Sequence, residues 1–341
     1  MSLLYGAVSK LPAPIPTTPT PPPPPPPPAP PPSGFLTREG QLLKLNGQTW
    51  RAVGWNPFGL TGCQGSIGNL NAAELDNLFG TVFRPNSLTR TWCFSHSDLA
   101  LIRLVIAKAE EWNQKLCMSL FEGAGHCGSP GYNGAWYSTP SNTYAWIDFI
   151  CNEFKNSTAI GMWELMNEGG AGATHEAWVA WNNAVAARIK SKAPNHLTTS
   201  GAIGSWPAHM NGETAFAAVH ASEYMDILHS HEYEYDYNGN TGVQGRHAQE
   251  LRAANTLNKP LMIGEFGTSR TSCTNATTRA TVTTTKYKAY LDSSPAVCAV
   301  LCWATAKAYI SSEPACSIAA NESFTAPAHE ASRNFTHANL P

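Results

Sequence analysis

The chain has 341 residues, of which 43% are hydrophobic and only 13% are charged, so it can bury a large core while carrying about half of the usual charged fraction of roughly 25%. The 22 lysines and arginines against 24 aspartates and glutamates give a net charge of -2, which excludes partners attracted by overall charge, namely nucleic acid and anionic membrane surfaces. No run of about 18 apolar residues is present, so no segment is expected to span a bilayer.

Residues 1–33 differ in composition from the rest of the chain, because 15 of the 26 prolines lie between Pro12 and Pro32. A run of prolines lacks backbone donors and adopts an extended polyproline II helix of about 3 Å per residue. We predict that residues 1–33 are a disordered or polyproline II linker and that residues 34–341 form one large domain. Recognition by a proline-binding domain is the alternative role of the linker. The first ten residues lack the basic segment and the cleavage site of a clear signal peptide.

Short apolar runs alternate with longer segments of helical spacing from Phe35 onward. Strands are predicted at residues 50–55, 88–93, 115–121, 160–166, 197–201, 225–231, 260–265 and 297–303. Helices are predicted at residues 99–114, 144–154, 176–192, 244–257 and 279–291, whereas the first, fifth and last helices of the series lack a clear pattern. Eight strand–helix units favour an α/β fold, a closed (β/α)8 TIM barrel. An open doubly wound sheet is the alternative, but no Gly-x-Gly-x-x-Gly follows the first strand.

The chemistry of a TIM barrel lies at the C-terminal ends of its strands. The residues at the predicted ends are polar or aromatic: Asn56, Arg90, Trp92, Glu122, Asn167, Glu168, His231, Tyr233, Glu265 and Trp303. Glu164 and Glu168 lie on one face of the same strand, but four residues at about 3.3 Å each separate them by roughly 13 Å, too far to act as a pair. We expect Glu164 to lie deeper in the barrel, in a structural role beside a basic or hydroxyl group.

Glu168 and Glu265 end the predicted fourth and seventh strands, so both side chains point into the same mouth of a closed barrel. Two carboxyl groups at one site favour glycoside hydrolysis. That reaction needs one group protonated, to donate to the leaving oxygen, and one ionised, to attack or to activate water. Arg90 would favour the ionised form of a neighbouring carboxyl group. A helix cap or a salt bridge would explain either glutamate alone, but the combination favours catalysis.

Several motifs together resemble glycoside hydrolase family 5, and within it the endo-β-1,4-mannanases. Arg-Thr-Trp-Cys-Phe at 90–94 resembles their second-strand Arg-x-Trp-x-Phe, residues 156–168 resemble their fourth strand, and His231-Glu-Tyr233 resembles their sixth-strand His-x-Tyr. Glu-Phe-Gly at 265–267 and Trp303 are similar to the seventh and eighth strands, and residues 35–56 resemble the hairpin and first strand that open the family's barrel. The resemblance covers most of residues 35–341 and implies a TIM-barrel glycoside hydrolase.

The resemblance implies that Glu168 is the general acid/base and Glu265 the nucleophile of a retaining reaction on β-1,4-linked mannan or glucomannan. Six further residues are implied around the substrate: Arg90, Asn167, His231, Tyr233, Trp303 and Asn56. Arg90 would bind Glu265 and keep it ionised, Asn167 would contact the 2-hydroxyl, and Trp303 would face the sugar in the cleaved subsite. The histidine and the tyrosine would complete the network. Sugar contact and a structural role at the strand end are both open for Asn56.

Three positions depart from the family pattern. Gly169 replaces the proline that usually follows the acid/base, which predicts a less constrained loop and a looser position for Glu168. Gly59 and Ala124 replace an aromatic residue after the first strand and a tryptophan after the third, so two sugar-stacking platforms are expected to be missing. Four loop aromatics offer a substitute or, in the favoured interpretation, shield the site or pack in the core: Phe58, Trp136, Tyr137 and Trp206.

The nine cysteines are too few for a disulfide scaffold of this length. Five fall in apolar segments and are predicted to be free and buried: Cys93, Cys117, Cys151, Cys298 and Cys302. Four lie in loop-like sequence and can pair: Cys63, Cys127, Cys273 and Cys316. Cys273 resembles a loop cysteine of fungal mannanases, and this resemblance implies Cys316 as its partner.

Other hypotheses stay open. His229 and His231 have the spacing of metal ligands in barrel hydrolases, with Glu232, Glu234 and Asp236 close by, so a metal-dependent hydrolase is the second hypothesis. A carbohydrate-binding protein on a decayed hydrolase scaffold is the third. An endo-β-1,4-glucanase is the alternative within the family, and hydrolysis and transglycosylation are both open. The favoured interpretation implies no metal or cofactor, a β-linked polysaccharide (mannan, glucomannan or glucan) as partner, and a secreted monomer.

Overall fold

The computed structural model describes residues 33–62, 70–83, 87–95, 97–123, 125, 134–232, 246–267, 276–305 and 318–319. The predicted linker before residue 33 lies outside the described residues. So do the four loop cysteines and several predicted site residues: Cys63, Cys127, Cys273, Cys316, Ala124, Tyr233, Glu234 and Asp236.

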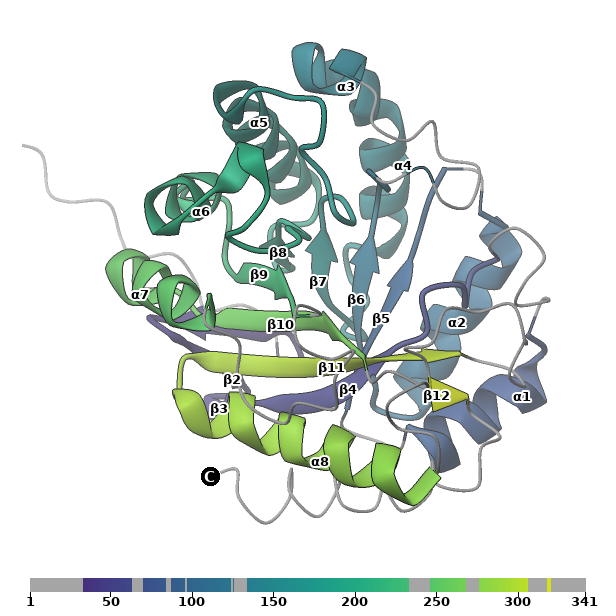
Figure 1. Ribbon diagram of the computed structural model, residues 1–341. Helices are drawn as coiled ribbons and strands as arrows, with labels where there is room; N and C mark the ends of the chain where they lie inside the picture. Colours follow the sequence, from purple (N-terminus) through teal and green to yellow (C-terminus); the bar gives the residue numbers. More distant parts are fainter. Residues whose placement is uncertain are drawn as a thin grey trace, which may run out of the picture. The chain divides into compact units, whose positions relative to one another are not determined.

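Parallel strands form the barrel of the described chain: β4 (Ala52–Asn56), β5 (Leu88–Trp92), β6 (Lys115–Ser119), β7 (Ile160–Glu164), β8 (Leu197–Thr199), β9 (Leu228–His231), β10 (Leu261–Phe266) and β11 (Val297–Thr305). They are hydrogen bonded in the order β8-β7-β6-β5-β4-β11-β10-β9, and a bridge between Thr199 and Ile227 joins the two ends of this series. The barrel is therefore nearly closed (Figure 1), which confirms the predicted (β/α)8 fold. A short strand, β12 (Ile318–Ala319), pairs with the C-terminal end of β11.

The strands are buried on both faces, because one face lines the barrel and the other packs against helices. Helical elements alternate with the strands: α1 (Ala72–Asn77), η1 (Leu78–Val82), α2 (Leu99–Glu111), α3 (Gly134–Ser138), η2 (Pro140–Thr143), α4 (Tyr144–Phe154), α5 (His175–Lys192), η3 (Ala208–Met210), α6 (Glu213–His220), α7 (His247–Leu257) and α8 (Ala276–Ser293). Asp98 and Thr174 cap α2 and α5 by accepting hydrogen bonds from backbone N–H groups of the first turn. The five predicted helices are present, α4 with the predicted ends.

An antiparallel sheet of β1 (Leu36–Glu39), β2 (Leu42–Leu45) and β3 (Gln48–Trp50) precedes the barrel, as the resemblance implied. Leu36, Leu43 and Trp50 of this sheet share one apolar cluster with barrel residues such as Leu88 and Met162. Leu88 begins β5, so this cluster lies toward the N-terminal end of the strands. The apolar sheet therefore covers that end of the barrel and leaves the C-terminal end for polar groups.

The strand predicted at 50–55 is wrong in one respect, because β3 ends at Trp50 and β4 begins at Ala52. Arg51 lies between them, and its guanidinium donates to the carbonyl groups of Leu291, Ser294 and Val297. The apolar pattern runs through both strands, whereas these long-range hydrogen bonds leave no sequence signal.

The five cysteines predicted to be free are free and buried, which confirms that prediction. Within the described residues, no helix has both the length and the apolar character needed to cross a membrane.

Candidate active site

The polar residues predicted at the strand ends meet at the C-terminal mouth of the barrel. Glu265 is in β10 and His231 ends β9. Glu168 follows β7 by four residues, in a segment that extends the sheet, because the Glu168 N–H donates to the carbonyl of Gly201 at 2.9 Å. Tyr233, the remaining member of the sixth-strand motif, lies outside the described residues.

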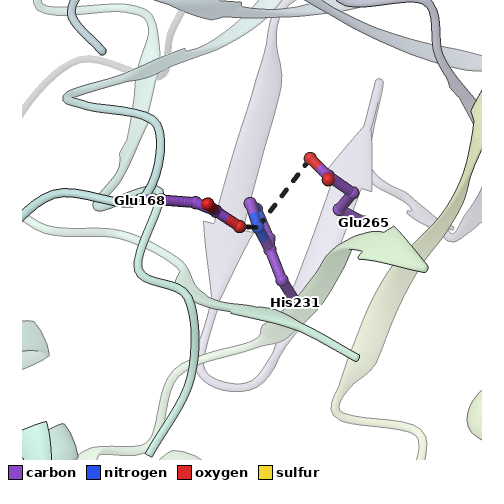
Figure 2. A group of neighbouring side chains, drawn as sticks. All are labelled: Glu168, His231 and Glu265. Carbon is purple, nitrogen blue, oxygen red and sulfur yellow. Dashed lines mark hydrogen bonds and ion pairs between the residues drawn. The ribbon is translucent and has the colours of Figure 1, made fainter. Parts of the chain in front are cut away.

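The carboxylates of Glu168 and Glu265 approach each other across an imidazole ring. Nδ1 of His231 lies 2.8 Å from Oε1 of Glu168 and 3.8 Å from Oε2 of Glu265, and Figure 2 shows the ring between the two carboxylates. One carboxylate oxygen of each glutamate and a ring nitrogen of His231 all lie within 4.8 Å of one another. His231 and Glu265 lie on the paired strands β9 and β10, whereas β7, which precedes Glu168, pairs with neither strand, so the closure of the barrel brings Glu168 to them.

Glu265 is held by side chains that contact its carboxylate directly. Its Oε2 accepts hydrogen bonds from Nη1 of Arg90 at 2.9 Å and from Nδ2 of Asn56 at 2.7 Å. The Glu265 side chain is 4% exposed, against 20% for Glu168. Asn56, for which the sequence left two roles open, is therefore a direct partner of Glu265. A cation and an amide donor on one oxygen both favour the carboxylate form.

Arg90 extends this network into the barrel. Its Nε and Nη2 each lie 2.6 Å from an oxygen of Glu164, and both side chains are fully buried. Burial alone would raise the pKa of Glu164, but the charge and the hydrogen bonds of Arg90 lower that pKa to about 2. Burial alone would lower the pKa of Arg90, and the attraction of Glu164 and Glu265 raises it instead. Glu164 thus lies deeper in the barrel beside a basic group, as expected from the strand spacing.

Asn167 is fixed by hydrogen bonds on both sides of its amide. Its Oδ1 accepts from Nη2 of Arg90 at 2.6 Å, and its Nδ2 donates to Oε1 of Glu122 at 3.1 Å. Glu122 is fully buried and also accepts from the N–H of Gly125. The sequence placed Glu122 at a strand end without a role, because its partner is an amide 45 residues away.

The backbone at Glu168 adopts an uncommon conformation. Its φ of +47° lies in the left-handed region, which costs a residue with a β carbon about 1 kcal/mol or more. Such strain persists only where surrounding contacts hold it, and it is common at functional sites.

The loop after Glu168 is not loose, in contrast to the expectation from Gly169. A β carbon on Gly169 would lie 2.3 Å from the ring of Trp178 and 2.6 Å from the sulfur of Met166. The N–H of Gly170 donates to the hydroxyl of Tyr137 at 2.8 Å. A neighbouring tryptophan therefore occupies the space that the family's proline would need, and the loop is held by side chains from other elements.

The loop aromatics divide by exposure. Phe58 and Tyr137 are buried, Trp136 packs edge-on against Phe121, and Trp206 is 46% exposed. Phe58 lies between Trp92 at 4.7 Å and the partly exposed Trp303 at 5.1 Å, measured between ring centroids. Packing in the core thus accounts for Phe58 and Tyr137, two of the four loop aromatics named from the sequence. Trp303 pairs with Asn56, the last residue of β4, which donates to Glu265, so Trp303 lies at the C-terminal end of the barrel.

Two groups of side chains have the composition of metal ligands. The first is the group at the mouth of the barrel, Glu168, His231 and Glu265. The second, Glu232, His247 and Glu250, is buried between β9 and α7. The Glu232 and Glu250 carboxyl groups hydrogen bond to each other, and burial raises the pKa of both. A proton shared between the Glu232 and Glu250 carboxyl groups therefore explains why two buried acidic groups lie together here.

The histidine pair of the metal hypothesis is split between two partners. Nδ1 of His229 lies 3.8 Å from Glu164 and 3.3 Å from the hydroxyl of Thr199, whereas Nδ1 of His231 lies beside Glu168. Burial lowers the pKa of His229 well below its ordinary value. His229 is thus a neutral ring in the barrel interior, and the two histidines do not share one ligand position in the described residues.

Comparison with known proteins identifies relatives of the same type. Residues 148–295 match the sequence profile described as GH family 5 beta-mannosidase-like. Mannan endo-1,4-beta-mannosidase A of Hypocrea jecorina is 25% identical over 294 residues, 71% of this chain and 65% of the relative. Mannan endo-1,4-beta-mannosidase F of Aspergillus fumigatus is 24% identical over 293 residues, 72% of this chain and 67% of the relative. The crystal structure of the endo-1,4-beta-mannanase from Rhizomucor miehei matches 89% of this chain and 100% of its own, with a TM-score of 0.71 at 17% identity.

These matches confirm the resemblance to glycoside hydrolase family 5 that the motifs indicated, and the structural match confirms the barrel fold. The curated relatives are themselves mannan endo-1,4-beta-mannosidases, the class of glycoside hydrolase that the motifs of this chain resemble. The aligned region spans only about two thirds of the curated relatives, so their names do not fix the particular reaction and substrate of this chain.

Proposed function

We propose that this protein is a retaining, endo-acting glycoside hydrolase that cleaves β-1,4-linked mannan or glucomannan by double displacement. The observation that carries the proposal is the spacing of Glu168 and Glu265, whose carboxylate oxygens lie within 4.8 Å of each other. Retaining glycosidases place their carboxyl groups about 5 to 5.5 Å apart, whereas inverting enzymes leave about 6.5 to 9.5 Å for a water molecule. The short distance between the Glu168 and Glu265 carboxylates supports direct attack on the sugar by one of them.

In the first step Glu265 attacks the anomeric carbon and Glu168 protonates the departing glycosidic oxygen. The contacts support this division of roles, because Arg90 and Asn56 stabilise negative charge on Glu265. Glu168 is more exposed and has one imidazole partner, His231, with which a proton can be exchanged.

In the second step Glu168, now ionised, removes a proton from water, and the water releases the sugar from Glu265. Glycosyl transfer uses the same intermediate with a second sugar as acceptor, and both outcomes are compatible with this site. Asn167 lies between Arg90 and Glu122 with its amide orientation fixed, which suits contact with the 2-hydroxyl. Trp303 would stack on the sugar in the cleaved subsite, and Tyr233 would complete the network around Glu265.

The substrate is the finer part of the proposal. The curated relatives are mannan endo-1,4-beta-mannosidases, which favours a mannan backbone over cellulose or mixed-linkage glucan. A polymeric substrate lies outside the cell, so we extend the proposal to a secreted, monomeric enzyme that needs no cofactor, with residues 1–33 as its linker and residues 34–341 as its catalytic domain.

The test is reducing-sugar release from mannan, glucomannan, carboxymethyl cellulose and mixed-linkage glucan in parallel. Glu265→Ala and Glu168→Ala are the test variants, and Glu223→Ala, which changes an exposed glutamate, is the matched control. We expect release from mannan or glucomannan that only the two test variants lose. Activity confined to glucans would keep the mechanism and change the substrate. Sugar binding by folded protein without hydrolysis of any polymer would support a binding scaffold instead.

A further inference from the structure

The peptide group between Gly169 and Gly170, which begins one residue after the proposed acid/base Glu168, is held by side chains at both its N–H and its carbonyl. The N–H of Gly170 donates to Oη of Tyr137 at 2.8 Å, and the carbonyl of Gly169 lies 3.1 Å from Nε2 of His209. These two atoms belong to the same peptide unit. Because a carbonyl oxygen only accepts, Nε2 of His209 carries the proton and donates.

Both partners are themselves fixed in place. Tyr137 of α3 is 5% exposed and packs edge-on against the stacked rings of Trp178 and Trp181 of α5, with ring centroids 5.4 and 6.0 Å away. Its hydroxyl donates to the sulfur of Met166 at 3.5 Å, so an oxygen lone pair is directed at Gly170. His209 belongs to η3, and its own carbonyl lies 2.9 Å from Nδ1 of His175.

No β carbon fits at the two glycines of this peptide. On Gly169 it would meet the ring of Trp178 at 2.3 Å, and on Gly170, whose φ is +95°, it would meet the ring of His209 at 2.5 Å. The two glycines therefore allow the aromatic and imidazole rings to approach the backbone. Because glycines have no β carbon, their φ and ψ angles are little restricted, so the orientation of this peptide group depends on the hydrogen bonds that hold it.

We propose that Tyr137 and His209 are positioning residues that fix the Gly169–Gly170 peptide and thereby aim Glu168 at the glycosidic oxygen. They do by hydrogen bonding what a proline after the acid/base does by restricting φ. The inference rests on the proposed function, because it assigns these residues a task in proton donation by Glu168. They are not catalytic residues, since they reach the reacting atoms only through the backbone.

A misplaced acid has a specific kinetic signature. Departure of a sugar polymer needs protonation of its oxygen, whereas dinitrophenolate leaves without it. Loosening the peptide should therefore lower kcat/KM for a mannan oligosaccharide and leave kcat/KM for a dinitrophenyl β-mannobioside nearly unchanged. General-acid catalysis contributes about 10² to 10⁴-fold, and we expect partial loss, about tenfold, from either side-chain change.

The experiment compares Tyr137→Phe, His209→Ala and the pair of changes on both substrates. Tyr224→Phe, which alters an exposed tyrosine, is the matched control. His209→Gln retains an N–H donor and should recover part of the lost activity. Thermal unfolding of each variant establishes that it is folded, and His209→Ala keeps the test decisive if Tyr137→Phe fails to fold.

The outcomes separate the two proposals. A selective loss on the oligosaccharide supports the positioning role. Equal losses on both substrates, or no loss on either, would overturn it while the wild-type enzyme and its Glu265 dependence still support the proposed function. A wild-type protein inactive on both substrates would instead refute the proposed function itself.

Discussion

Glu265 and Glu168 face each other across His231, yet different parts of the molecule hold them. Glu265 is fixed through its carboxylate, by Arg90 and Asn56. Within the described residues, the hydrogen bond recorded for the Glu168 carboxylate comes from His231, and the remaining constraint is on its backbone. A nucleophile must stay ionised in one position, so rigid charged partners suit it. An acid/base must gain and lose a proton, so a fixed backbone with few charged contacts suits it better.

The largest expected effect separates the two glutamates by chemistry. Glu265→Ala should lower activity by about 10⁴-fold or more, in line with the loss of a nucleophile in other enzymes. Added azide should then give a glycosyl azide of inverted configuration, because it replaces the nucleophile. Glu168→Ala with azide should give the retained configuration, because Glu265 still forms the intermediate. Proton NMR of the azide products distinguishes them, and the same configuration from both variants would contradict the assigned roles.

The next effect tests the ion pair beneath Glu265. Arg90→Met should destabilise the fold by about 3 to 5 kcal/mol, because it leaves the buried Glu164 carboxylate without its partner. Urea unfolding measures this change, and Arg103→Met, which breaks an exposed pair with Glu153, should lower the free energy of unfolding far less. Similar losses of unfolding free energy in the two variants would show that the buried ion pair of Arg90 and Glu164 contributes little to stability.

On the Glu168 side, the expected effect is steric. Gly169→Pro should destabilise the protein by about 1 to 3 kcal/mol, although proline is usual at this position in the family, because Trp178 and Met166 occupy the required space. In a Trp178→Ala background the same proline should cost less, a coupling that a double-mutant cycle measures. Additive costs would mean that the tryptophan is not the obstacle.

Acid should weaken the Glu265 side. The pKa of Glu164 falls from 4.5 to about 2 on folding, so its contribution to stability is fully present above about pH 4.5 and is lost as the pH falls toward 2. The free energy of unfolding, measured by urea titration across this range, should decrease with falling pH. Glu164→Gln should remove that part of the slope, at a cost in stability at neutral pH.

Alkali should destabilise the buried carboxyl pair of Glu232 and Glu250. Burial and the neighbouring Glu250 raise the pKa of Glu232, so the folded protein keeps a proton that the unfolded chain releases. The resulting stability is fully present below the ordinary value of 4.5 and is lost as the pH rises through the raised pKa. Glu250 also accepts from the N–H of Ser205 at 2.9 Å, in the loop that leads to His209.

Glu232→Gln tests this second pH effect. The amide stays neutral at every pH, so unfolding free energies from about pH 5 to about pH 9 should vary less than in the wild type. Glu223→Gln, at an exposed position, should follow the wild-type curve. Matching curves for all three proteins would show that the buried carboxyl pair does not titrate with folding.

The sequence predicted the barrel because short, mostly apolar runs, such as the one that contains Leu116, Cys117 and Met118, alternate with segments of helical spacing. The polar residues near the strand ends also predicted Arg90, Glu168 and Glu265, because glycoside hydrolysis needs two carboxyl groups and a cation favours the ionised form of one of them. Tyr137 and His209 could not be predicted as partners of one peptide group, because they come from the short helices α3 and η3, far apart in the sequence, and their targets are backbone atoms. The proline missing after Glu168 gave the only signal, and it indicated a loose loop. The packing of Trp178 shows the opposite.

Covalent trapping tests directly whether Glu265 attacks the sugar. Incubation with a 2-deoxy-2-fluoro mannosyl donor that carries a good leaving group should accumulate the glycosyl-enzyme, because fluorine slows the second step more than the first. Peptide mass spectrometry should then locate the sugar on the peptide that contains Glu265, and on no peptide of Glu265→Ala. A sugar attached to another residue, or turnover with inverted configuration and no adduct, would contradict the account.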